Sequence, residues 1–247
     1  MRYFIGNWKM FGVPKSITIL NKINLFYKKD KNQAKYRVII TPPYTLIESF
    51  SKYFRNKMIL IGSQNCYHKD LFSSNTAAIS PYMIKSVGAK YTLIGHSDNR
   101  AEGDNNSMLR EKVEYSLKNN LKIVFCIGEN KSDKKNNRTL SVLKKQINRV
   151  LNKKMNKTNI IVAYEPIWSI GTGKTPTVLD LKKTIFHIKK ELKNIFKKSS
   201  PPVLYGGSVD EHNVKMFKEI KEIDGFLIGG ASKSSKKFID IIKNYYR

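Results

Sequence analysis

The segment VAYEPIWSIGTGKTP, residues 162–176, places one carboxylate beside a glycine-rich stretch that ends in Gly-Lys-Thr. The carboxylate, Glu165, could remove a proton as a general base, and the N–H groups of a glycine-rich loop could bind phosphate. The stretch is not a nucleotide-binding P-loop, because Trp168 stands where that motif requires its first glycine. The segment therefore predicts a phosphate site of another kind.

Two later glycine-rich segments also follow apolar runs: Gly-Gly-Ser at 206–208 and Gly-Gly at 229–230. Backbone donors from the three segments could jointly hold one phosphate group. The residues expected to supply these donors are Gly171, Ser208, Gly229 and Gly230. Without a nucleotide motif, this set indicates a small sugar phosphate as the ligand.

Other polar residues follow apolar runs earlier in the chain. Asn7 and Lys9 come after the first run, and His96 and Ser97 come after the fourth. Taken alone, each has an ordinary interpretation, because a strand-end charge usually faces solvent, a lone His is usually structural and glycine pairs usually serve turns. Their shared position at the ends of apolar runs favours a common site.

The elements that must position these residues alternate along the chain. Eight short β-branched runs predict strands, at 3–6, 36–41, 58–63, 91–95, 122–127, 159–164, 203–206 and 226–229. Between them, apolar residues recur at helical spacing, for example Ile17, Leu20, Ile23 and Leu25; Met108, Val113 and Leu117; Leu140, Leu143, Ile147 and Leu151; and Leu181, Ile185, Ile188 and Leu192. The pattern predicts a (β/α)8 barrel, with an open doubly wound sheet as the alternative.

A barrel brings the C-terminal ends of all its strands to one rim, which is where barrel active sites form. We expect residues 1–247 to form a single domain, because no linker or change in composition divides the chain. The prolines fall at predicted element boundaries. The polar stretch KSDKKNNR, residues 131–138, is predicted to be a surface loop.

The chain is strongly basic, with 46 Lys and Arg against 19 Asp and Glu and a formal charge of +27. Such a charge can attract nucleic acid, anionic lipid or an anionic substrate. The lysines occur as pairs spread along the sequence, among Asn, Ile, Tyr and Phe, as an AT-rich coding sequence would give. We therefore expect no specific nucleic-acid partner and interpret the charge as a solvated surface.

The remaining composition indicates a globular protein. Hydrophobic residues make up 40% of the chain and aromatic residues 11%. The N-terminus lacks the features of a secretory signal and no segment is long and apolar enough to span a membrane, so a soluble cytoplasmic protein is expected. Cys66 and Cys126 have no partner at metal-ligand spacing and are predicted to be buried free thiols.

Six motifs, GNWKM, IGHS, CIGE, AYEPIWSIGTGKT, LYGGSV and LIGGAS, occur in an order and at separations that resemble the triosephosphate isomerases over the whole chain. The resemblance implies a (β/α)8 barrel and the interconversion of dihydroxyacetone phosphate and glyceraldehyde 3-phosphate in glycolysis and gluconeogenesis. It also implies no cofactor, no metal and a homodimer.

The same resemblance assigns roles to residues. Glu165 matches the base, His96 the electrophile that polarises the substrate carbonyl, and Lys9 and Asn7 the groups that stabilise the enediolate and the phosphate. Ser97, Asp98 and Glu129 are expected to support them. Trp8 is expected to pack on the opposite face of its strand.

A mobile lid over the substrate is implied by the segment that follows the base. Its residues are Pro166, Ile167, Trp168, Ser169, Ile170, Gly171, Thr172, Gly173, Lys174, Thr175 and Pro176. Closure of such a lid expels water and disfavours loss of phosphate from the enediolate to give methylglyoxal.

Two positions depart from the family pattern. Asp98 stands in place of the usual Glu, so Lys9 could be held less rigidly and turnover lowered. Asn99 and Ala78 replace both members of an ion pair that joins subunits in the family, which leaves the strength of the dimer open. Contacts between subunits are expected from the third loop, through Leu71, Phe72 and Thr76.

Other functions stay open at this stage. A related barrel enzyme could isomerise a four-carbon sugar phosphate, which the Asp98-Asn99 pair allows. A basic nucleic-acid-binding protein would need aromatic residues interleaved with Lys and Arg on one face. A glutamate-based phosphatase would need a metal cluster that the sequence does not display.

Overall fold

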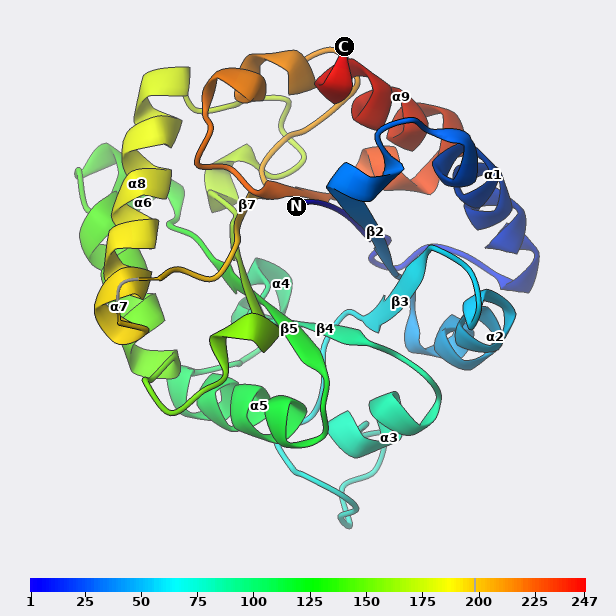
Figure 1. Ribbon diagram of the computed structural model, residues 1–247. Helices are drawn as coiled ribbons and strands as arrows, with labels where there is room; N and C mark the ends of the chain where they lie inside the picture. The colour runs from blue at the N-terminus through cyan, green and yellow to red at the C-terminus, as the bar shows by residue number, and fades with distance from the viewer. Residues whose placement is uncertain (198) are drawn as a thin grey trace.

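The computed structural model describes residues 1–197 and 199–247, whose strands close into a parallel barrel in chain order (Figure 1). Each strand pairs with the next, and β1 also pairs with β8, so Tyr3 lies beside Gly225. The strands are β1 (Arg2–Asn7), β2 (Tyr36–Thr41), β3 (Leu60–Ser63), β4 (Tyr91–Ile94), β5 (Lys122–Ile127), β6 (Ile160–Tyr164), β7 (Val203–Tyr205) and β8 (Gly225–Ile228). The predicted barrel is confirmed, and the open sheet is excluded.

Helices surround the barrel as an outer ring (Figure 1). They are α1 (Ile17–Lys29), α2 (Tyr44–Phe54), α3 (Pro81–Ser86), α4 (Ser97–Ala101), α5 (Asn106–Lys118), α6 (Lys131–Lys135), α7 (Thr139–Val150), α8 (Val178–Ile195) and α9 (Ser235–Tyr246). The connection between β7 and β8 carries the 3-10 helix η5 (Val214–Glu219) where the repeated pattern would place an α-helix. None of the described helices is long and apolar enough to cross a membrane.

The prediction that 131–138 is a loop was wrong in part, because α6 occupies its first five residues. The Asn130 side chain accepts a hydrogen bond from the Asp133 N–H at 2.8 Å and caps the helix. Asp133 also places a negative charge in the first turn, where the helix dipole favours it. These capping interactions therefore favour a helix here, although the segment is polar in composition.

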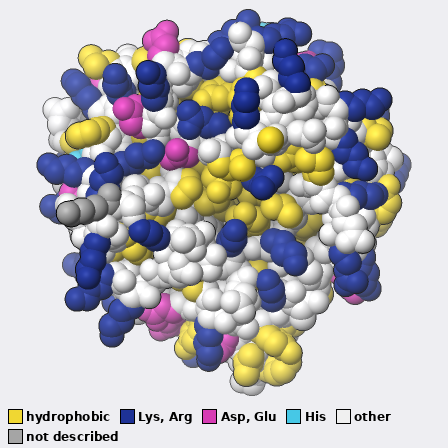
Figure 2. All heavy atoms as spheres, in the orientation of Figure 1, with side chains coloured by type: hydrophobic (Ala, Val, Ile, Leu, Met, Phe, Trp, Pro, Cys, Tyr) yellow, Lys and Arg dark blue, Asp and Glu magenta, His cyan; other side chains and the backbone are white. Residues whose placement is uncertain are grey.

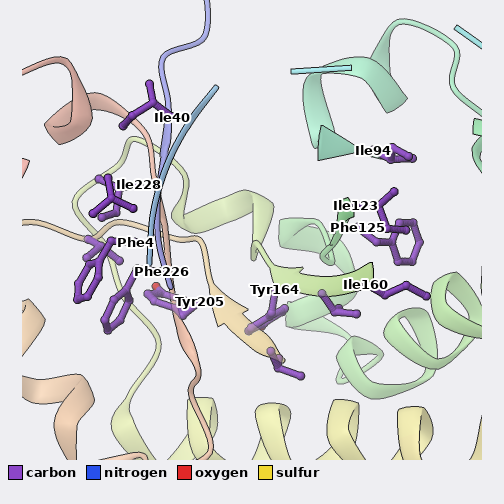
Figure 3. Packing of buried hydrophobic residues seen from close by; sticks show 14 of the residues in the cluster. Phe4, Ile40, Ile94, Ile123, Phe125, Ile160, Tyr164, Tyr205, Phe226 and Ile228 are labelled. Carbon is purple, nitrogen blue, oxygen red and sulfur yellow. The ribbon is translucent and has the colours of Figure 1, made fainter. Parts of the chain in front are cut away.

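Alternation along the strands separates the core into two clusters. One fills the barrel and includes Ile161 and Ala163 of β6. The other lies between the strands and the helices and includes Tyr164 of the same strand. Figure 3 shows part of this outer cluster, with Phe4, Phe226 and Tyr205 lying close together. Buried Cys66 and Cys126 are free thiols, as predicted.

Two of the apolar residues at helical spacing lie outside the buried faces of their helices. Leu25 of α1 is 59% exposed and Leu140 of α7 is 42% exposed. In α1 the buried stripe runs through Leu20, Ile23 and Tyr27, at helical spacing that turns Leu25 toward solvent. In α7 the buried stripe runs through Thr139, Leu143, Ile147 and Val150 and leaves Leu140 outside it.

The positive charge is spread over the visible surface, as the scattered lysine pairs predict. Figure 2 shows Lys and Arg side chains over much of the visible face, with few Asp and Glu among them. On this face the basic side chains do not gather over a single element. The view therefore agrees with a solvated basic surface.

Candidate active site

A cavity of about 390 Å³ opens at the C-terminal ends of the strands. It is lined by all of the residues expected to bind or react with substrate, namely Asn7, Lys9, His96, Glu165, Gly171, Ser208, Gly229 and Gly230. Asn7 is the last residue of β1, and the others come from the loops after β1, β4, β6, β7 and β8. A cavity of this size suits a small ligand, and its polar groups converge from separate elements.

Glu165 is positioned by the alternation of β6. Ile161 and Ala163 face the barrel interior, and the next residue in that series is Glu165, which is 5% exposed. Burial is the largest influence on this carboxyl and raises its pKa, while the nearby Lys9 ammonium lowers it. A carboxylate with a raised pKa is a stronger base than one in water.

His96 lies at a sharp turn between β4 and α4. Gly95 has a φ of +78°, a left-handed conformation that favours glycine, and it turns the chain so that His96 caps the helix. The Nδ1 atom of His96 accepts a hydrogen bond from the Asp98 N–H at 3.1 Å. An accepting Nδ1 carries no proton, so the imidazole is the neutral tautomer with its proton on Nε2. That Nε2 lies 3.7 Å from Oε1 of Glu165.

Lys9 is held in an uncommon backbone conformation, with a φ of +53°. The side-chain amide of Gln64 donates to the Lys9 carbonyl at 2.8 Å and to the Thr41 carbonyl at 2.9 Å. The Lys9 Nζ atom lies 3.1 Å from Oδ2 of Asp98. Asp98 therefore reaches Lys9 in spite of its shorter side chain.

Trp8, between Asn7 and Lys9, points away from the cavity. It is fully buried, and its indole N–H donates to the Ser232 carbonyl at 3.1 Å. Its ring packs edge-on against Phe50 of α2. The prediction that Trp8 packs on the outer face is confirmed.

Glu129 lies outside the barrel, behind the cavity. Its position continues the alternation of β5 on the side that faces outward from the barrel. Its Oε1 accepts hydrogen bonds from the Tyr164 hydroxyl at 3.2 Å and the Trp168 indole at 2.8 Å. It does not line the cavity. These contacts hold the start of the expected lid in place. Glu129 is therefore placed to support Trp168, and not the side chains of His96 and Lys9. Ser97, the first residue of α4, likewise lies beside the cavity and is not among its lining residues.

The expected lid begins with the 3-10 helix η4 (Ile167–Ser169) and continues through two glycines in left-handed conformation. The φ angles of Gly171 and Gly173 are +69° and +74°. Ile170, Gly171 and Gly173 line the cavity beside the glycine-rich loop after β7. The segment thus covers part of the mouth.

Several residues around the site were not found from the sequence. Lys237 of α9 adds a second cation to the cavity, and its position in a Lys-Lys pair gave no reason to select it. Gln146 of α7 accepts the Gly128 N–H and donates to the Gly128 carbonyl, both at 2.9 Å. A side chain does not fit at Gly128, because its backbone lies against Glu165: an added Cβ would be 1.8 Å from the Glu165 carbonyl oxygen.

The third loop, between β3 and α3, projects beyond the ring of helices (Figure 1). Leu71 is 50% exposed and Phe72 is 76% exposed, and Thr76 is also exposed. Ala78 and Asn99 line a separate cavity of about 260 Å³. Among the described residues, no group of three or more His, Cys, Asp or Glu side chains could hold a metal ion.

The family model described as triosephosphate isomerase matches residues 2–245. A triosephosphate isomerase of Debaryomyces hansenii is 36% identical over 249 residues, covering 98% of each chain. One from Thermodesulfovibrio yellowstonii is 34% identical over 246 residues, again covering 98% of each chain. The crystal structure of triosephosphate isomerase from Bartonella henselae superimposes with a TM-score of 0.90 at 30% identity, covering 100% of this chain and 99% of the other.

Proposed function

The chain belongs to the triosephosphate isomerase family, and on that premise we propose that it interconverts dihydroxyacetone phosphate and D-glyceraldehyde 3-phosphate with Glu165 as the base. The observation that carries this assignment of roles is the approach of His96 Nε2 to Glu165 Oε1, 3.7 Å apart in the cavity. A base and a neutral proton donor so placed can act on adjacent carbon and oxygen atoms of one substrate.

In the first half of the reaction, the Glu165 carboxylate removes a proton from C1 of dihydroxyacetone phosphate. The electron pair of that C–H bond forms a C1–C2 double bond, and the C2 carbonyl oxygen takes up negative charge. The Nε2–H of His96 donates to this oxygen, and the Lys9 ammonium stabilises the charge electrostatically. A neutral histidine in this role is a known feature of triosephosphate isomerases as a class.

In the second half, the protonated Glu165 returns its proton to C2. The electron pair of the C1–C2 double bond forms the new C2–H bond. The proton of the O1 hydroxyl passes by way of His96 to the oxygen on C2, which becomes a hydroxyl, and the O1 electron pair forms the aldehyde carbonyl of D-glyceraldehyde 3-phosphate. The same carboxylate thus acts as base and then as acid, with no net gain or loss of atoms. Burial supports both steps, because the raised pKa of Glu165 brings its two protonation states closer in free energy.

The phosphate is assigned to the backbone N–H groups of Gly171, Ser208, Gly229 and Gly230, which line the cavity. Donors fixed on several loops can hold a dianion without a metal or a nucleotide motif. The lid residues 166–176 would then exclude water from the enediolate, which protects it from loss of phosphate.

The test of these roles is an isomerase assay in which glyceraldehyde 3-phosphate formation is followed with a coupling dehydrogenase. The wild-type chain is expected to be active, and Glu165→Ala is expected to lose about a thousandfold in kcat, the scale of a missing general base. Lys145→Ala, at an exposed position of α7 outside the cavity, serves as the control for handling and folding. Wild-type turnover in Glu165→Ala would exclude Glu165 as the base.

Assembly as a homodimer in the cytoplasm completes the proposal. The exposed Leu71 and Phe72 on the projecting third loop support an apolar contact between subunits. The two free, buried thiols are compatible with a reducing compartment.

A further inference from the structure

The hydroxyl group of Ser169 joins three separate segments of the site. Ser169 ends η4, at the start of the lid, and is fully buried although Gly171 to Lys174 are exposed. Its Oγ lies 2.6 Å from the Lys174 carbonyl oxygen, 3.2 Å from the Tyr205 hydroxyl and 3.2 Å from the Ser208 nitrogen. These partners belong to the far end of the lid, the end of β7 and the phosphate loop.

The hydrogen bonds use the full capacity of the hydroxyl. A serine hydroxyl has one proton to donate and two lone pairs that accept. The Lys174 carbonyl can only accept, so it takes the Ser169 proton. Tyr205 must therefore donate its own proton to Ser169, and the Ser208 N–H donates to the second lone pair.

The bond to Lys174 closes the lid into a ring. Ile170 to Gly173, the part of the lid that includes the cavity-lining residues, lies between the two ends that this bond joins. The ring is thereby fixed at its base to Tyr205, which is also fully buried. A shift of the Ser169 hydroxyl would move both ends of the lid together.

The loop after β7 packs directly on this cluster. An added Cβ at Gly207 would lie 2.2 Å from the Tyr205 hydroxyl oxygen and 2.6 Å from Ser169 Oγ. An added Cβ at Gly206 would lie 2.6 Å from Cγ of Glu165. Successive residues of one short loop therefore contact the base, the lid and, at Ser208, the proposed phosphate position.

We infer that Ser169 is a positioning residue that couples phosphate binding to the placement of the lid. The Ser208 N–H is assigned to the phosphate, and a phosphate oxygen that takes it competes with Ser169 for the same donor. Binding of the phosphate thus changes the partners of the hydroxyl that holds both ends of the lid. This inference rests on the proposed isomerase function and adds to it the route by which the phosphate acts on the lid.

The test compares substrates with and without phosphate in Ser169→Ala. For D-glyceraldehyde 3-phosphate, kcat/KM is expected to fall about tenfold, because a displaced lid misplaces the reacting groups. The fraction of turnovers that give methylglyoxal is expected to rise. D-glyceraldehyde has no phosphate to compete for the Ser208 N–H, so kcat/KM for this substrate is expected to change less than about twofold.

Two further variants separate this role from a loss of folding. Tyr205→Phe removes one donor to Ser169 and should produce the same selective loss to a smaller degree. Ser116→Ala removes a fully buried hydroxyl elsewhere, beside Cys66, and should leave the ratio of the two kcat/KM values unchanged. Thermal unfolding of each variant measures how much stability has been lost.

An equal loss on both substrates in Ser169→Ala would overturn the inference, because a purely structural role affects both reactions alike. An unchanged kcat/KM and methylglyoxal fraction would also overturn it. If the wild-type chain did not isomerise the phosphorylated substrate at all, the proposed function would fail instead, so the two failures are distinguishable.

Discussion

His96 Nε2 lies 3.7 Å from Glu165 Oε1, and both side chains are at least nine-tenths buried at the mouth of the barrel. The two residues are far apart in sequence and reach each other because β4 and β6 end at the same rim. The Asp98 N–H fixes the histidine tautomer, and burial raises the pKa of the glutamate. The pKa of the base and the tautomer of the proton donor therefore have separate local causes.

The raised pKa of Glu165 predicts the acid limb of the activity profile. The base must be ionised, so kcat/KM is expected to fall as the pH is lowered through its pKa, with a midpoint above the value of about 4.3 that is usual for glutamic acid. Measurement of kcat/KM across pH checks this. A profile that stays flat down to the usual value would contradict the effect of burial.

The same shift predicts how Glu165 affects stability. A carboxyl whose pKa is raised on folding favours the folded state below its unfolded pKa, and this contribution is lost as the pH rises through the folded pKa. Glu165→Gln is therefore expected to raise the Tm at pH 8 and to change it little near pH 4. Thermal unfolding at both pH values tests this. A Tm increase confined to acidic pH would reverse the assigned direction.

Asp98→Glu restores the longer acid beside Lys9. Because Asp98 already reaches the Lys9 ammonium at 3.1 Å, the variant is expected to be as active as the wild type or more active. Steady-state kinetics decide the matter. A loss of more than about tenfold, or about 1.4 kcal/mol, would mean that the site has re-formed around the shorter side chain.

Deletion of residues 170–173 removes the part of the lid that lines the cavity. The fold is expected to survive, because Gly171 to Gly173 are exposed. The methylglyoxal formed per turnover is expected to rise, since the enediolate would meet water. If the folded variant forms the same amount of methylglyoxal per turnover as the wild type, the assignment of these residues as a lid is contradicted.

Gly128→Ala tests the contact beneath the base. The new Cβ would lie 1.8 Å from the Glu165 carbonyl oxygen, so the free energy of unfolding is expected to fall by about 3 kcal/mol and activity to fall with it. Gly103→Ala is the matched control, because Gly103 has a φ of +114° with nothing within 4 Å of an added Cβ. Its loss is expected to be about 1 kcal/mol, from backbone strain alone. Equal losses in the two variants would show that packing against Glu165 is unimportant.

Much of this architecture could be predicted from the sequence, because strand alternation and strand ends are local properties. The runs at 36–41 and 122–127 match β2 and β5 residue for residue. The outward direction of Glu129 follows from the alternation of β5, although the motif alone suggested a place in the site. The exposure of Leu25 could not be predicted, because an apolar residue beside a buried stripe looks the same in sequence as one within it.

The supporting contacts could not be predicted, because they depend on how distant loops pack. Gln146 meets Gly128 only once α7 lies against the end of β5. Ser169 meets Tyr205 and Ser208 only through the packing of the loop after β7. Nothing in the local sequence of either residue marks these partners.

The most direct test of Glu165 as the base is isomerisation of dihydroxyacetone phosphate in D2O, with deuterium in the product located by NMR. A carboxylate that takes a proton from C1 and exchanges it with solvent before returning it predicts deuterium at C2 of D-glyceraldehyde 3-phosphate from the wild type. Glu165→Ala should form labelled product about a thousandfold more slowly than the wild type. Product without deuterium from the wild type, together with labelled product formed by Glu165→Ala at the wild-type rate, would contradict the account.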